Sequence, residues 1–358
     1  IPGFVDLHAH HTDEPSGVVP THRPMSALAL AYGVTTTVDP ATWSEQAFPV
    51  ADAIEVGAVV GPRTLSSAEF VIAPGIAWGD YRNVATLADA QAQVDRRAAW
   101  GAATIKNYRQ PGRNEHQLLA AAARARGISL TSEGGPLYLD VGYAIDGQTG
   151  WEHMIADLPL YRDATTFFGR AGLVFSPTLI VAGVPHGAME YYRPLAKLLD
   201  DPKIRRFTPY PIVAAKVAAA KPKTIEEVAF PIMAEGIADI VKAGGFVAIG
   251  EHGEQPGLGS HWELWTYATA LSPLQALKVA TWDGAYFIGV HEEIGSIRAG
   301  KLADLVILDA DPLVDIRNSI RIGRVMRAGR LYDADSLDEL WPGNRRYGPV
   351  PWPTDPVR

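Results

Sequence analysis

The sequence predicts an α/β fold, a TIM-like (β/α)8 barrel with a small, incomplete β-sandwich subdomain. Eight short apolar runs rich in β-branched residues alternate with longer Ala- and Leu-rich stretches, as in βα units around a parallel sheet. Glycines follow several of the helical stretches and precede a strand, where a left-handed residue ends the helix. These glycines are Gly33, Gly101, Gly127 and Gly172.

The elements follow in order along the chain. We expect strands at Phe4–His8, Val34–Asp39, Ala68–Ala73, Ala103–Asn107, Ile128–Glu133, Gly150–His153, Leu173–Pro177 and Phe246–Gly250. The helical stretches between or after them are Pro24–Tyr32, Leu87–Trp100, Glu115–Arg126, Ile225–Ala243 and Pro273–Ala280.

Near Gly295 the pattern changes to short strands split by turn-rich segments. Leu305–Leu308 and Arg324–Met326 are the strand candidates there, which indicates a small β subdomain. The tail from Pro342 to Pro356 is rich in Pro and aromatic residues, so we expect it to be extended. The predicted division is a barrel over 1–290, a β-sandwich segment over 291–335 and an extended C-terminal tail over 336–358.

Composition limits the function classes. The chain has 358 residues and a formal net charge of -8, without the Lys and Arg clusters of a nucleic-acid surface, so the expected partner is a small molecule or short peptide. No Cys is present, which excludes disulfides, thiolate metal sites and a cysteine nucleophile. The most apolar stretch, Gly172–Val184, is too short to cross a membrane as a helix.

The first residues already form a core strand without a Met or a signal-peptide pattern, so we expect that N-terminal sequence, a segment or a domain, is missing. Localisation stays open between cytoplasmic and exported. We also expect a homo-oligomer.

The first strand ends in a pair of histidines. In Asp6-Leu7-His8-Ala9-His10 the two imidazoles are two residues apart, so they point the same way and can bind one ion, with zinc favoured. An isolated pair of this kind is accidental or structural in roughly half of cases. Its place at the C-terminal end of a barrel strand favours a metal site.

Other strand ends carry further ionisable groups. Lys106 follows a buried-looking strand; it is either solvated or a desolvated amine that reacts with carbon dioxide, giving a carbamate that bridges two metals. Glu133 and His153 end two further strands, and each is either a satisfied polar group or a functional one. In Gly250-Glu251-His252-Gly253-Glu254, two carboxylates flank an imidazole and offer a general base beside a metal.

Three more residues are candidates for substrate binding. Tyr108 and Arg109 follow Lys106 and can contact a carbonyl or carboxylate, although roughly half of such loop residues are merely solvated. His261 follows a Gly-rich loop and can contact substrate or help to start a helix, with Ser260 as its N-cap.

The motifs resemble those of the amidohydrolase superfamily. Pro2 to His10 resembles its opening metal motif, and Gly33 to Thr37 resembles its second-strand signature. Ala280 to Ala285 and Gly295 to Asp309 are similar to the segment that leads from the last barrel helix into its β-sandwich. The sequence most resembles the imidazolonepropionase and prolidase-like branch, especially amidohydrolase domains that follow a β-propeller in long bacterial proteins.

The resemblance implies a metal-dependent hydrolase that cleaves an amide-type C–N bond of a peptide, dipeptide or cyclic amide through metal-activated water. It implies one or two divalent ions, with Zn²⁺ favoured. His8 and His10 would bind the first metal, Lys106 would be the carboxylated bridge of a binuclear centre, and His153 would bind the second metal.

Two positions differ from the residues usual in the imidazolonepropionase and prolidase-like branch. Glu133 stands where a His usually follows the fifth strand, and His252 stands where the eighth strand has an Asp. This suggests an exchange that keeps the set of ligands. Glu133 would then be a metal ligand or the base, and His252 a ligand or proton shuttle, with Glu251 as the rival base.

Two alternatives remain open at the level of sequence. The same site could hydrolyse a lactone or another ester, since fold does not fix substrate. The two departures also leave open a catalytically degenerate barrel that binds ligands or serves a structural role, which stoichiometric metal content would distinguish. A serine hydrolase and a dinucleotide-binding protein are disfavoured, because the chain has neither GxSxG nor GxGxxG at the required place.

Overall fold

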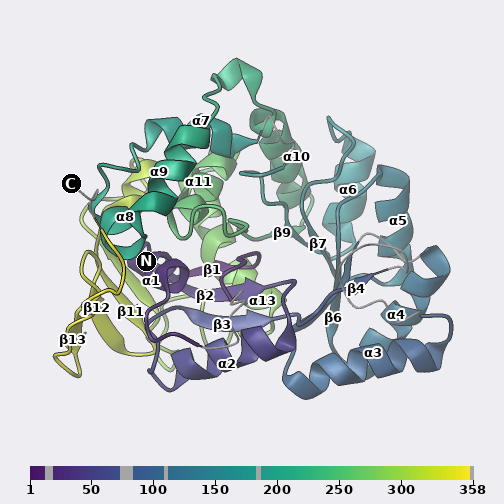
Figure 1. Ribbon diagram of the computed structural model, residues 1–358. Helices are drawn as coiled ribbons and strands as arrows, with labels where there is room; N and C mark the ends of the chain where they lie inside the picture. Colours follow the sequence, from purple (N-terminus) through teal and green to yellow (C-terminus); the bar gives the residue numbers. More distant parts are fainter. Residues whose placement is uncertain (13–18, 73–83, 109–111, 183–186, 355–358) are drawn as a thin grey trace.

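The fold is mixed α/β, with two parallel sheets and one antiparallel sheet (Figure 1). The computed structural model describes residues 1–12, 19–72, 84–108, 112–182 and 187–354. The first parallel sheet has the order β1-β2-β3 and the second the order β4-β5-β6-β7-β8-β9. The strands are β1 Phe4–Asp6, β2 Val34–Asp39, β3 Arg63–Ser66, β4 Val71–Ile72, β5 Thr104–Tyr108, β6 Ser129–Glu133, β7 Gly150–Glu152, β8 Val174–Ser176 and β9 Phe246–Val247.

A few backbone hydrogen bonds connect the two parallel sheets at both ends. Asp6, in β1, forms an isolated parallel bridge with Ile249, and the Leu7 N–H donates to the Ile249 carbonyl at 2.9 Å. At the other junction, the Ala103 N–H donates to the Ser66 carbonyl at the end of β3 at 2.8 Å. The carboxyl ends of β1, β7 and β9 therefore come close together.

Helices lie outside the parallel strands. In Figure 1, α3 to α6 lie on the outer side of the six-stranded sheet, and α1 and α8 lie near the antiparallel sheet. The helices are α1 Pro24–Ala31, α2 Ser44–Glu55, α3 Leu87–Trp100, α4 Arg113–Arg126, α5 Leu137–Asp146, α6 Arg162–Arg170, α7 Ala188–Leu195, α8 Pro202–Phe207, α9 Tyr210–Ala219, α10 Phe230–Lys242, α11 Leu258–Tyr267, α12 Pro273–Lys278 and α13 Gly284–Phe287. Shorter turns are the 3-10 helices η1 Ile225–Glu227 and η3 Ile316–Ile320, and the π-helix η2 Val279–Asp283.

The antiparallel sheet consists of β10 Leu305–Leu308, β11 Ile322–Arg327, β12 Arg330–Asp333 and β13 Glu339–Trp341, paired in that order. The start of the chain joins it, because Pro2 bridges Leu305 and the Ile1 ammonium donates to the Val306 carbonyl at 2.9 Å. This small β region was expected. Strand β13 falls within 336–358, where only an extended tail was expected.

Several predicted elements match the structure closely. β2, α3 and β10 have the predicted bounds, and the four glycines proposed to end helices have φ between 71° and 94°. At Gly33 a side chain would also meet Val306, because a Cβ there would lie 2.9 Å from a Val306 methyl carbon. Both observations account for glycine at this position.

Two predicted elements were wrong in detail. The run Ala68–Ala73 contains only β4, at Val71–Ile72; Ala68 has a φ of 60° outside any strand, and Ala73 lies outside the described residues. The helix expected over Ile225–Ala243 is broken into η1 and α10. Pro231 explains the break, since proline is tolerated in the first turn of a helix but not in its interior.

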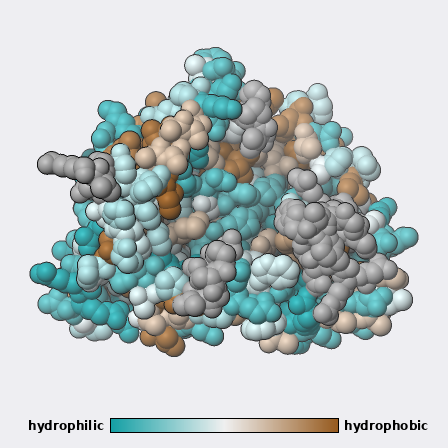
Figure 2. Space-filling model, in the orientation of Figure 1, coloured by the Kyte–Doolittle hydropathy of each residue, from teal (hydrophilic) through white to brown (hydrophobic). Residues whose placement is uncertain are grey.

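A search of the described residues for helices with the length and apolar character of a membrane span finds none. Figure 2 shows hydrophilic residues across the middle of one face of the molecule, with apolar residues in separate patches around them.

Candidate metal centre and substrate cleft

Four histidines meet at the carboxyl ends of the parallel strands. The ring centroids of His8 and His153 are 4.6 Å apart, and the His252 ring lies 5.0 Å from each of them. The His10 ring lies 4.9 Å from the His252 ring. Ligand atoms of His8, His153 and His252 all lie within 4.8 Å of one another, so these three imidazoles can share one ion.

The backbone at this cluster is unusual. His153 and His252 have φ values of 66° and 65°, a left-handed conformation that side chains other than Gly rarely adopt. Backbone hydrogen bonds hold both residues: the His153 N–H donates to the Ser176 carbonyl at 2.9 Å, and the His252 N–H donates to the His8 carbonyl at 2.7 Å. Such conformations concentrate at functional sites.

A buried ion pair adjoins the histidines. Lys106 Nζ lies 2.7 Å from Glu152 Oε2 and 3.3 Å from Glu133 Oε1. Burial opposes the charge of Lys106, but the two carboxylates prevail and raise its pKa. Burial likewise opposes ionisation of Glu133, but the hydrogen bond from His153 and the charge of Lys106 bring its pKa to about 2. Without a bound ion, Lys106 is therefore an ammonium and Glu133 a carboxylate.

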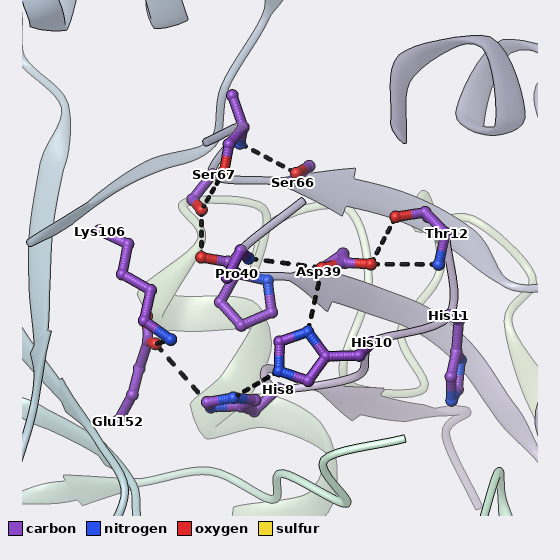
Figure 3. A network of polar contacts seen from close by, with 12 residues as sticks. His8, His10, His11, Thr12, Asp39, Pro40, Ser66, Ser67, Lys106 and Glu152 are labelled. Carbon is purple, nitrogen blue, oxygen red and sulfur yellow. Dashed lines mark hydrogen bonds and ion pairs between the residues drawn. The ribbon is translucent and has the colours of Figure 1, made fainter. Parts of the chain in front are cut away.

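Asp39 and Thr178 orient two of the histidines. His10 lies between His8 and Asp39 (Figure 3), with its Nε2 3.1 Å from His8 Nε2 and its Nδ1 3.4 Å from Asp39 Oδ1. Burial raises the pKa of Asp39, but bonds from His10 and Thr12 lower it overall. On the other side, His153 Nδ1 lies 2.6 Å from the hydroxyl of Thr178. Partners of this kind fix the ring orientation of metal-binding histidines.

The donor set fits a divalent metal. Burial lowers the pKa of His8 and of His153, which keeps both imidazoles in the neutral form that binds metals. His8 Nδ1 is buried and has no hydrogen-bond partner within the described ranges; the nearest carboxylate oxygen, Glu152 Oε2, is 3.9 Å away. An unpartnered buried imidazole nitrogen is costly unless a ligand such as a metal ion satisfies it.

Glu251 belongs to a second buried network that points away from the histidines. It is paired closely with His11, whose ring faces away from His8 in Figure 3. Its backbone N–H donates to Asp6, which also accepts from the Ser260 hydroxyl at 2.8 Å. Burial and the nearby Glu251 raise the pKa of Asp6 to about 7. This network connects β1 to the loop after β9.

A cleft of about 820 Å³ opens beside the cluster. Its polar lining includes Tyr108, Glu133, His153 and His252. Its apolar wall includes Met154, Ile155, Leu158, Val181 and Met233. The candidate metal site and an apolar binding surface therefore share one cavity, as expected for a small-molecule site.

Comparisons with known proteins point to one superfamily. The Amidohydrolase family model matches residues 234–332. Among solved structures, a Xaa-Pro dipeptidase with bound methionine in its active site has a TM-score of 0.67 at 20% identity, covering 93% of this chain and 86% of its own. The bottromycin amidohydrolase has a TM-score of 0.67 at 20% identity, covering 94% and 77%. The resemblance to the amidohydrolase superfamily is confirmed.

A third solved structure, the A. niger ochratoxinase, has a TM-score of 0.65 at 20% identity, and the match covers 93% of this chain and 82% of that one. At these identities the likeness concerns the fold. No curated protein matches the chain in sequence. The segment matched by the amidohydrolase family model contains β9, His252, the strands β10 and β11, and most of β12.

The structure places the predicted amidohydrolase site residues in three groups. It brings His8, His10, Lys106, Glu133, His153 and His252 together, and Tyr108 lines the adjoining cleft. Arg109 lies outside the described residues. Glu251 and His261 lie elsewhere.

His261 does not match the predicted substrate contact. It is fully buried in α11, where its ring nitrogens lie 2.9 Å from both the Tyr32 carbonyl and the Ser319 hydroxyl. Burial lowers its pKa to about 3. The proposed cap was also wrong, because α11 begins at Leu258 after Gly257, and Ser260 lies inside the helix. His261 therefore connects the helix to the surrounding core.

Sequence reasoning missed Glu152, Asp39 and Thr178. Glu152 is buried in β7 beside His153, and it also accepts from the Thr131 hydroxyl at 2.6 Å. The available signal was its position at a strand end next to a candidate ligand. Asp39 similarly ends the predicted second strand, at the same edge as His8.

Proposed function

We propose that the protein is a metal-dependent hydrolase that cleaves an amide-type C–N bond of a peptide, dipeptide or cyclic amide through an activated water. The convergence of His8, His153 and His252 at a cleft beside the buried Lys106 ion pair carries this proposal. The amidohydrolase family match and the dipeptidase and amidohydrolase structures support the choice of an amide bond.

The proposed architecture is a (β/α)8 barrel over 1–290. The bridge from Asp6 to Ile249 and the bond from Ala103 to Ser66 support closure of the strands into a ring. The antiparallel sheet would be the β-sandwich segment, over 291–335 and extended by β13 within 336–358. In this arrangement the metal residues occupy the end of the barrel where such enzymes have their sites.

The proposed metal ligands are His8, His10 and His153, with Glu133 able to contribute an oxygen; His252 is either a further ligand or the proton shuttle. Imidazole nitrogens with carboxylate oxygens suit Zn²⁺, and the number of ions is one or two. Lys106 is the proposed carboxylated bridge of a two-ion centre. Its present ion pairs keep it an ammonium, whereas carbamate formation needs the neutral amine, so an intact mass increased by one carbon dioxide is the direct test.

A bound divalent metal lowers the pKa of water from about 16 to about 7 and polarises a carbonyl. Glu133 is a carboxylate at the cleft surface and can accept a hydrogen bond from the attacking water, which orients it. A carboxylate with a pKa of about 2 is a weak base, so we assign the transfer of the proton to His252, whose ring also faces the cleft. The proton is then delivered to the leaving nitrogen.

Glu251 is the less favoured base. Its carboxylate is fully buried and paired with His11, so it lacks access to a water in the cleft. The apolar wall formed by Met154, Ile155 and Met233 would contact an apolar side chain of the substrate and exclude water from the reacting bond.

The test compares Glu133→Gln and His252→Gln with Glu251→Gln in zinc-replete protein. We expect turnover of a responsive dipeptide or cyclic amide to fall about 10²- to 10⁴-fold in the first two variants. Glu251→Gln should lower the free energy of unfolding, because it disrupts a buried pair. It should reduce turnover much less than the first two variants do. If Glu133→Gln keeps the turnover of the parent protein, the role assigned to Glu133 is wrong.

The substrate panel should contain matched amides and lactones. Activated water attacks C–N and C–O bonds alike, so faster turnover of lactones would favour an ester hydrolase on the same site. Absence of bound metal after growth in metal-supplemented medium would favour a binding or structural barrel and reject the hydrolase.

A further inference from the structure

A fully buried carboxylate outside the proposed metal centre contacts the segment that follows β8. Glu263 lies on α11, and its Oε1 accepts from the Leu179 N–H at 2.9 Å while its Oε2 accepts from the Ile180 N–H at 3.0 Å. The hydroxyl of Tyr267, one turn later on the same helix, donates to Glu263 Oε1 at 2.6 Å. The two oxygens of one side chain therefore bind two consecutive backbone groups of a distant segment.

These two backbone groups begin a tight turn. The N–H groups of Val181 and Ala182 both donate to the Thr178 carbonyl, at 3.0 Å and 2.9 Å, so residues 178–182 form one turn. The first N–H groups of a helical turn have no acceptor within it and need one from outside. Glu263 supplies an acceptor to each of them, which fixes the position of the turn relative to α11.

The turn carries groups of the candidate site. The Thr178 hydroxyl lies 2.6 Å from Nδ1 of His153, and Thr178 has a φ of 48°. A backbone conformation of this kind persists only where the surrounding structure determines it. Val181 and Ala182 line the cleft. A displaced turn would therefore move both the partner of a proposed metal ligand and a part of the cleft wall.

The contacts of Glu263 do not require its charge. Burial raises the pKa of Glu263 to about 8, although the bonds from Tyr267, Leu179 and Ile180 lower it, so the neutral acid prevails at pH 7. Both oxygens of the neutral acid keep lone pairs, whereas the amide nitrogen of glutamine accepts no hydrogen bond. Glu263→Gln therefore removes an acceptor from the turn at nearly constant charge.

We propose that Glu263 is a positioning residue of the metal centre, which holds the turn at 178–182 so that the Thr178 hydroxyl meets His153. The inference rests on the proposed metal-dependent hydrolase, because it concerns a ligand of that centre. Groups behind a metal-binding histidine set its orientation and the metal affinity. A role in stability alone would leave the metal affinity of the folded protein unchanged.

The test is the zinc affinity of the full chain at pH 7, measured by competition with a zinc-binding indicator. We expect Glu263→Gln to bind zinc about tenfold more weakly, the lower end of the loss caused by removing a direct partner of a metal-binding histidine, because Glu263 acts through Thr178. His261→Phe is the matched control, since His261 is also buried in α11 but contacts Tyr32 and Ser319. Its zinc affinity should stay within about twofold of the parent.

Circular dichroism at the temperature of the titration verifies that each variant is folded. Parental zinc affinity in Glu263→Gln, or an equal loss in His261→Phe, would overturn the proposal. If the parent itself binds no zinc, the proposed metal centre fails together with this inference, and that result differs from a failure of the inference alone.

A double-mutant cycle tests the route through Thr178. Glu263→Gln combined with Thr178→Val should bind zinc within about twofold of Thr178→Val alone, because the hydroxyl that Glu263 positions is already absent. Multiplied losses, or parental affinity in Thr178→Val, would overturn the proposal. If Glu263→Gln does not fold, Tyr267→Phe replaces it in the same cycle, with an expected loss of about threefold from the missing hydroxyl bond to the carboxylate.

Discussion

Replacing Thr178 by valine removes the hydroxyl that holds His153 and leaves the shape of the side chain almost unchanged. Thr178 is fully buried, with its hydroxyl 2.6 Å from His153 Nδ1. Its φ of 48° is unfavourable for any β-branched residue, so threonine and valine bear the same backbone strain. The substitution therefore tests the hydrogen bond itself.

The expected effect is a weaker metal site. Without Thr178, the buried N–H of His153 lacks its partner, which costs about 1–3 kcal/mol. Because about 1.4 kcal/mol corresponds to a factor of ten, metal affinity should fall roughly 5- to 150-fold. This agrees with the roughly 10- to 100-fold loss typical when a partner of a metal-binding histidine is removed.

Competition with a zinc-binding indicator measures the affinity, and Thr178→Ser is the matched control because it keeps the hydroxyl. We expect the serine variant to bind zinc within a few-fold of the parent. If the valine variant binds zinc as tightly as the parent, or if serine and valine weaken binding equally, the hydrogen bond does not position His153 and the reasoning is wrong.

Three further outcomes are expected. Dialysis against a chelator should abolish turnover, and added Zn²⁺ should restore it; undiminished turnover by metal-free protein would contradict the proposed function. Burial lowers the pKa of His116 from 6.5 to about 4 although its bond to Gln148 opposes the shift, so folding favours the neutral ring. The stability that this provides is present above pH 6.5 and should fall by about 3 kcal/mol as pH decreases to about 4, as urea unfolding would measure; the same slope in His116→Gln would refute the assignment. His261→Phe should leave the Tyr32 carbonyl and the Ser319 hydroxyl without their imidazole partner and lower the free energy of unfolding by about 2–3 kcal/mol, whereas a raised KM with unchanged stability would instead indicate substrate contact.

The sequence predicts elements well where local chemistry is decisive. Helix α3 has its predicted bounds because the Thr86 and Asp89 side chains cap its start and Gly101 ends it. Helix α2 is not predicted, since Pro49 lies inside it and Trp43 provides no side-chain cap. Its formation depends on packing: its buried residues include Val50 and Ile54.

The sequence predicts which strand ends carry the residues of the candidate site, but not which of these residues contact one another. His8, Lys106, Glu133 and His153 all follow or end predicted strands, and a parallel sheet brings such ends together. Which carboxylate contacts Lys106 depends on the register of β5, β6 and β7, which no local pattern specifies. The partner at 2.7 Å is Glu152, one residue before a predicted ligand.

The same geometry explains why Glu251 is a poor candidate for the base. Glu251 and His252 are adjacent, but His252 faces the cleft while Glu251 faces His11. Which of the two faces inward depends on how the segment after β9 pairs with β1. The His252 to His8 backbone bond provides that information, and it joins residues far apart in the sequence.

That bond has a consequence for biosynthesis. The imidazoles that come together at the centre are His8, His153 and His252, so the cluster forms only after the chain has been synthesised through residue 252. Contacts of such large sequence separation form slowly, because a long loop must close first. A nascent chain that stops before β9 leaves the edges of β1 and β8 unpaired, and unpaired strand edges favour aggregation.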